Sequence, residues 1–210
     1  ITKAVTGSNS AVTLRETAIT SVDASTSGAN GTLSISQATD GAADAMAVTL
    51  GSVLNVTAAQ LTLNTVDTET MTVDSIGADG NTLTLGNMTA GTTATATAAA
   101  VAAAAATATD LTSVTITGSK NLTLTASSKN TALATVNADA FTGSTLSVTA
   151  NSGTTQAAMT VTAPNTSATI NTGKGADTVT VGDGGTALVN SIIKTPKIKT
   201  EIFVRLALSA

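Results

Sequence analysis

The sequence predicts an all-β protein, built as a β-solenoid or a β-roll-like stack of short strands. Three observations favour this fold class. Aliphatic and hydroxyl residues alternate strictly, turn-forming residues separate the alternating runs, and one pattern recurs at a spacing typical of stacked coils. Two β-sandwich domains are the alternative, because their strands have similar lengths.

The alternation predicts strands that are buried on one face. It is clearest in four runs, Thr82–Leu85, Val114–Thr117, Leu122–Thr125 and Thr145–Thr149. Gly, Asn, Asp and Ser separate such runs, and residues 78–81 and 118–121 are good turn candidates. These residue types allow positive φ angles or bond their own backbone, so they favour turns between short strands.

A repeat lies beneath the alternation. Leu111–Val114 and Leu133–Val136 begin 22 residues apart, and each leads through a glycine to a second alternating run. Ile19–Ala24 begins a third copy, and Leu63–Asp67 is a fourth, looser one. A period of about 20 residues is typical of solenoid coils, each of which buries its apolar face on its neighbours.

The composition limits both the core and the function. The 210 residues include 46 Thr and 39 Ala but only 2 Phe and no Trp or Tyr, so thin layers of small aliphatic side chains must form the core. Charged residues make up 10% of the chain, which carries a net charge of -4. Without a basic stripe or an aromatic platform, nucleic-acid binding is not expected. Without a long apolar run, neither is a transmembrane helix.

Shifts in composition divide the chain into four parts. They are a Thr/Ala-rich β domain at 1–90, an Ala/Thr-rich connector at 91–109, a β-solenoid at 110–190, and a C-terminal cap or export segment at 191–210. The chain starts at Ile1 without a signal peptide. We therefore expect that a leader peptide has been removed, that a signal elsewhere directs export, or that the chain is a fragment of a longer protein.

One turn carries the sharpest chemical signal. Residues 172–180 match the nonapeptide G-G-x-G-x-D-x-U-x at every defined position except the first. Carbonyls of Gly173 and Gly175 with the carboxylate of Asp177 predict a calcium site, to which Asp183 in the next, degenerate turn is a possible contributor. A plain glycine turn is the alternative, because each ion needs ligands from two adjacent coils.

A second candidate calcium site is the pair Asp67 and Glu69, whose side chains share one face if the segment is extended. A solvated strand end is the alternative. The chain has no His and no Cys, so the common general bases and activated nucleophiles are missing and no enzymatic activity is expected.

Two stretches resemble RTX-type S-layer proteins of Gram-negative bacteria. Residues 133–143 with 146–150 are similar to the Thr/Ala-rich body of those proteins, and residues 169–180 to the start of their glycine–aspartate repeats. The resemblance is good over roughly residues 111–190. Over residues 1–90 it is limited to the general character of the sequence. This sequence departs from the family in having so few nonapeptides.

The resemblance implies secretion by a type I system, folding driven by calcium, and self-assembly into a two-dimensional S-layer lattice on the cell surface. The expected partners are further copies of the chain, with cell-surface polysaccharide bound through another region. An adhesin stalk or an RTX-like tail module of a larger secreted protein is the alternative function. Few aromatic residues argue against a ligand-binding adhesin.

Overall fold

The protein folds into two stacked sheets of short strands, and every element among the described residues is a strand. The computed structural model describes residues 3–5, 11–17, 20–24, 31–37, 43–52, 58–66, 68–86, 111–128, 130–150, 158–173, 175–182 and 185–191.

The sixteen strands alternate between the two sheets along the chain. The odd sheet contains, in order, β1 (Lys3–Val5), β3 (Ser21–Ala24), β5 (Ala45–Leu50), β7 (Thr70–Ser75), β9 (Ser113–Gly118), β11 (Thr135–Asn137), β13 (Thr160–Ala163) and β15 (Thr178–Val181). The even sheet contains β2 (Ala11–Thr17), β4 (Gly31–Gln37), β6 (Gln60–Val66), β8 (Asn81–Leu85), β10 (Leu122–Ala126), β12 (Thr145–Ala150), β14 (Ser167–Gly173) and β16 (Thr186–Ser191).

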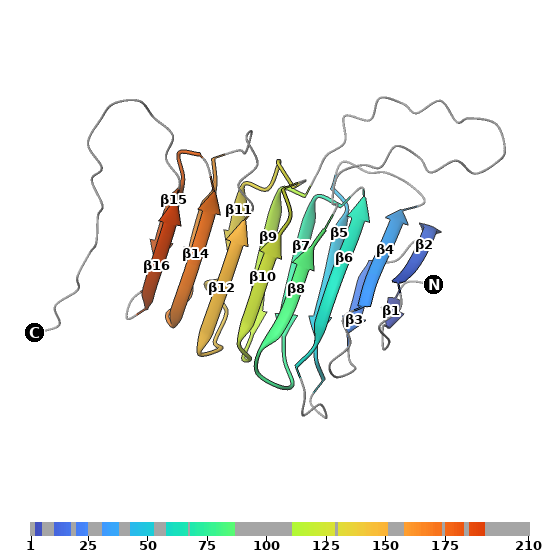
Figure 1. Ribbon diagram of the computed structural model, residues 1–210, viewed down its shortest axis with the longest axis horizontal. Coiled ribbons are helices and arrows are strands. Elements are labelled where there is room, and N and C mark those ends of the chain that lie inside the picture. The colour runs from blue at the N-terminus through green and yellow to red at the C-terminus, as the bar shows by residue number, and fades with distance from the viewer. Residues whose placement is uncertain are drawn as a thin grey trace, which may run out of the picture.

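Each coil therefore contributes one strand to each sheet, and the coils follow one another along the long axis of the molecule (Figure 1). All neighbouring strands are parallel, as in the pairs β7–β9 and β10–β12. The predicted all-β, solenoid-like stack is confirmed. The alternative of β-sandwich domains is wrong for the described strands, because a sandwich pairs its strands antiparallel.

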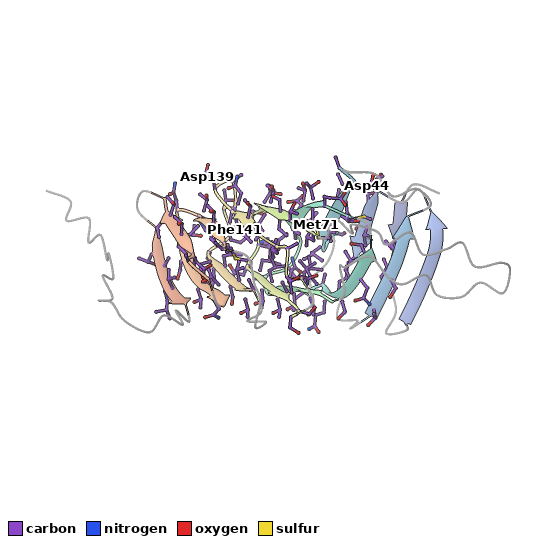
Figure 2. The ribbon with its side chains drawn as sticks, turned by 90° about the horizontal axis from the view of Figure 1, so that it is seen from above. Asp44, Met71, Asp139 and Phe141 are labelled. Atoms are coloured by element: carbon purple, nitrogen blue, oxygen red, sulfur yellow. The ribbon has the colours of Figure 1, made fainter. Side chains whose placement is uncertain are left out.

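The alternation seen in the sequence separates core from surface. In β8 and β10, the Leu residues are buried and the Thr residues between them are half-buried or exposed. Side chains from both sheets meet in a single core, where Met71 and Phe141 lie between the two layers (Figure 2). Each fully buried aliphatic side chain stabilises the fold by about 1.5–3 kcal/mol. Many such side chains, stacked coil upon coil, together supply the stability that aromatic side chains supply in a deeper core.

The strand register confirms one predicted repeat and corrects another. Val114 of β9 pairs with Val136 of β11, which is the 22-residue offset expected for the copies at Leu111 and Leu133. The looser copy at Leu63–Asp67 is out of phase, because β6 lies in the even sheet and β9 and β11 lie in the odd one. The same aliphatic–hydroxyl pattern occurs in both sheets, so the pattern alone does not identify the sheet.

Strands from the ranges 1–90 and 110–190 contribute to the same two sheets. β7 pairs with β9 and β8 pairs with β10 in unbroken register, although more than twenty residues separate β8 from β9. The predicted connector at 91–109 and the residues after Ser191 lie outside the described residues.

Tight corners between the sheets require glycine. Gly118 ends β9 with a φ of 100°, and a Cβ atom there would lie 2.2 Å from the carbonyl oxygen of Ser75 on the preceding coil. The same carbonyl accepts hydrogen bonds from the amides of Ser119 and Lys120, at 3.0 and 3.1 Å. Only a residue without a side chain allows the coils to approach this closely with that backbone conformation.

Candidate functional site

The predicted calcium turn connects β14 to β15. Gly173 is buried and has a φ of 83°, a conformation that glycine adopts without strain, and Asp177 immediately precedes β15. The local fold therefore follows the nonapeptide pattern, with glycines in the turn and an aspartate at its exit. Asp183, the other carboxylate predicted to contribute, lies outside the described residues.

The Asp177 carboxylate bonds to the protein on both oxygens. Its Oδ1 accepts the backbone N–H of Met159 at 3.0 Å, and its Oδ2 accepts the hydroxyl of Thr172 at 2.6 Å. Met159 belongs to the preceding coil, whereas Thr172 starts the same turn and is fully buried. Asp177 therefore joins two coils and closes its own turn.

The described donors around Asp177 do not fit a calcium cage. Thr178 pairs with Thr160, so the position next to Asp177 on the preceding coil is Met159, which offers no side-chain oxygen. Calcium takes six to eight oxygen ligands, usually with several carboxylates. Among the described ranges, no group of three or more Asp, Glu, His or Cys side chains is close enough to hold a metal ion. Calcium binding at this turn stays a prediction.

Glu69, predicted to pair with Asp67 in a calcium site, is instead 5% exposed and bonds to the main chain. Its Oε2 accepts the backbone N–H of Asp44 at 2.5 Å. Its carbonyl oxygen accepts the N–H and the hydroxyl of Thr112, at 2.9 and 3.0 Å. Glu69 thus joins three successive coils where β5, β7 and β9 begin. Asp67 lies outside the described residues, so the predicted pair itself is not tested.

Sequence reasoning missed a buried side chain that bonds to four groups of the described residues. Asn81 is fully buried and its Oδ1 accepts the N–H of Ala59 at 2.7 Å. Its Nδ2 lies 2.9 Å from Ser75 Oγ, 2.9 Å from the Ile76 carbonyl and 3.3 Å from the Leu50 carbonyl. One signal could have found it. Asn81 lies two residues before Leu83 in β8, at a position where the alternation places an inward-facing, apolar residue.

Three of the described polar side chains join neighbouring coils. Asp177, Glu69 and Asn81 each satisfy main-chain groups of a neighbouring coil, which is the usual role of buried polar side chains. Among the described residues, no helix is long and apolar enough to cross a membrane. No protein-family model, curated protein or solved structure matches the chain.

Proposed function

We propose that this chain is a structural, non-enzymatic protein of the bacterial cell surface that assembles with copies of itself, as an S-layer subunit does. The composition and the family resemblance support a secreted lattice protein. The observation that carries the proposal is the pair of ends that the stack presents. Among the described strands, β1 and β2 form one end and β15 and β16 the other.

The last coil exposes side chains that occupy core positions. Val181 is in register with the buried Ala163, and Val189 with the buried Ile170. Val181 is nevertheless 38% exposed and Val189 41% exposed, because no further described strand pairs beyond them. An end with exposed apolar side chains and unpaired main-chain groups is a template for pairing with another chain.

The strands at one end of the stack can pair with those at the other end. Head-to-tail contact would place β1 of one copy beside β15 of the next, and β2 beside β16, so that both parallel sheets continue. The strands to be paired have similar lengths, three and four residues in one sheet and seven and six in the other. A head-to-tail contact of this kind is heterologous and does not close on itself, so it produces filaments that lateral contacts would organise into a lattice.

The test measures assembly of the full chain by light scattering coupled to size-exclusion chromatography and by negative-stain microscopy. We expect oligomers that grow with protein concentration. Val189→Lys places a charge on the end of the stack and should abolish growth. Leu188→Lys is the matched control, because Leu188 is already 62% exposed and its neighbour in register, Thr169, lies on the outer face.

Val181→Lys repeats the test in the other sheet, and circular dichroism confirms that each variant is folded. A folded wild-type chain that stays monomeric at every concentration would contradict self-assembly and favour the alternative of a passive adhesin stalk or tail module. Running each measurement with calcium and with chelator separately tests the predicted dependence on calcium.

A further inference from the structure

The outer face of the odd sheet carries a two-dimensional array of small polar side chains. Across β7, β9, β11, β13 and β15, each strand presents two outward residues separated by one inward residue, which is buried in all of them except β15, where Val179 is half-buried. The first rank consists of Thr70, Ser113, Thr135, Thr160 and Thr178, and the second of Thr72, Thr115, Asn137, Thr162 and Thr180. We call these ten residues the hydroxyl face.

The hydroxyl face is exposed and neutral. Seven of its ten side chains are exposed and the other three, Ser113, Thr115 and Thr162, are half-buried. None of the ten residues is charged, and the register between the five strands has no shift. A neutral face does not attract nucleic acid or an anionic surface.

The register fixes the dimensions of the array. Neighbouring strands lie about 4.8 Å apart, and residues two apart on one strand are separated by about 6.6 Å. Thr is β-branched and restricted at χ1, so the hydroxyl and methyl groups are held in a regular pattern before any partner arrives. A partner that contacts all ten positions at once must itself repeat in two dimensions on this scale.

Ice has such a repeat. Each O–H···O link is about 2.75 Å long, so in a tetrahedral lattice oxygens that share a neighbour lie about 4.5 Å apart and the layers repeat at about 7.3 Å. These distances agree with those of the hydroxyl face to within about a tenth. Ice is neutral and hydroxyl-rich, which matches the chemistry of the face.

We propose that the hydroxyl face adsorbs to ice. Thr hydroxyls hydrogen-bond water at lattice positions, and the methyl groups between them release water when the surfaces meet. A flat polysaccharide fits less well, because aromatic rings supply most apolar contact area in interfaces. The chain has no Trp or Tyr, and Phe141 is buried.

The even sheet provides an internal comparison. Its outer face is also rich in Thr, but Asn171 donates to the hydroxyl of Thr149 and Asn64 donates to that of Ser34. The exposed Leu188 also interrupts its last strand. One hydroxyl of the odd face is bonded as well, because Thr70 donates to the carbonyl of Asp44 at 3.5 Å. No aliphatic side chain interrupts its ten positions, however, so the proposal concerns the odd sheet alone.

The experiment freezes a solution of the full chain slowly and measures how much protein enters the ice and how much stays in the liquid. Protein is quantified by amino-acid analysis, because the chain lacks Trp and Tyr and absorbs little ultraviolet light. We expect the wild type to enter the ice and to slow its recrystallisation. Thr115→Lys puts a long, hydrated cation in the middle of the hydroxyl face and should lower both effects several-fold. Thr125→Lys makes the same change on the even sheet and should leave them unchanged.

Thermal unfolding of each variant confirms that the stack is intact. A wild-type chain that remains in the liquid would overturn the proposal, as would an equal loss in the two variants. Retention on crystalline cellulose or chitin without any effect on ice would assign the face to polysaccharide instead. The result does not depend on self-assembly, because the hydroxyl face lies along the side of the stack and not at its ends.

Discussion

Asn81 offers the sharpest test of how the coils are held together. Replacing it with Ala removes the acceptor of the Ala59 amide and the donor to the carbonyls of Leu50 and Ile76. These three main-chain groups belong to the corners next to β5, β6 and β7, so a single side chain bonds to its own coil and to the coil before it.

The expected cost follows from two of those groups, the Ala59 amide and the Ile76 carbonyl, because the Leu50 carbonyl still accepts the N–H of Ile76 at 2.9 Å. A buried group left without a partner costs about 1–3 kcal/mol, so Asn81→Ala should lower the free energy of unfolding by about 2 kcal/mol or more. Asn171→Ala is the control, because it removes one half-exposed hydrogen bond to Thr149 and should cost about 1 kcal/mol or less.

The assay combines urea denaturation with hydrogen exchange, because stacked coils can unfold locally before they unfold globally. Faster exchange of the Ala59 and Thr82 amides, both at this corner, is the specific expectation. If Asn81→Ala and Asn171→Ala lose the same stability, the buried hydrogen bonds of Asn81 do not hold the coils together.

Two further predictions concern the corners and the calcium turn. Gly118→Ala should destabilise by more than the about 1–2 kcal/mol that a positive φ costs, because its Cβ would meet the Ser75 carbonyl. Gly80→Ala, at a φ of 88°, should cost only that amount in a urea titration, because its Cβ would make just an ordinary contact with the Ala58 Cβ at 3.9 Å. Asp177→Ala should destabilise by about 1–3 kcal/mol in chelator, since its carboxylate accepts hydrogen bonds from the protein itself. A loss that occurs only when calcium is present would instead make Asp177 a calcium ligand.

Local patterns predicted the strands well, since each strand buries one face. The runs at Val114 and Leu122 occur within β9 and β10 as expected, and the 22-residue offset reappears as strand register. The sheet to which a run belongs was not predictable from the run itself. Residues 63–67 follow the same pattern but their strand lies in the even sheet, because both sheets face one core and have the same period.

The site was less predictable than the fold. The turn at Asp177 forms as the motif implies, but the partners of its carboxylate depend on the coil before it, which the motif does not specify. Asn81 follows Asp79 and Gly80, so it resembles a surface turn residue in sequence. Its burial depends on the fold of the coil before it, which a local pattern does not contain.

The strand pairs keep their register except for shifts in β2–β4 and β14–β16, although the peptides that connect the strands differ in length. Val161 and Val179 are paired neighbours 18 residues apart in sequence, whereas Val73 and Ile116 are paired neighbours 43 residues apart. Doubling the length of a loop costs only about 0.6 kcal/mol in closure entropy. Corners of this protein can therefore accept inserted peptides of very different length, and the molecule is suited to displaying foreign sequences at intervals along the stack.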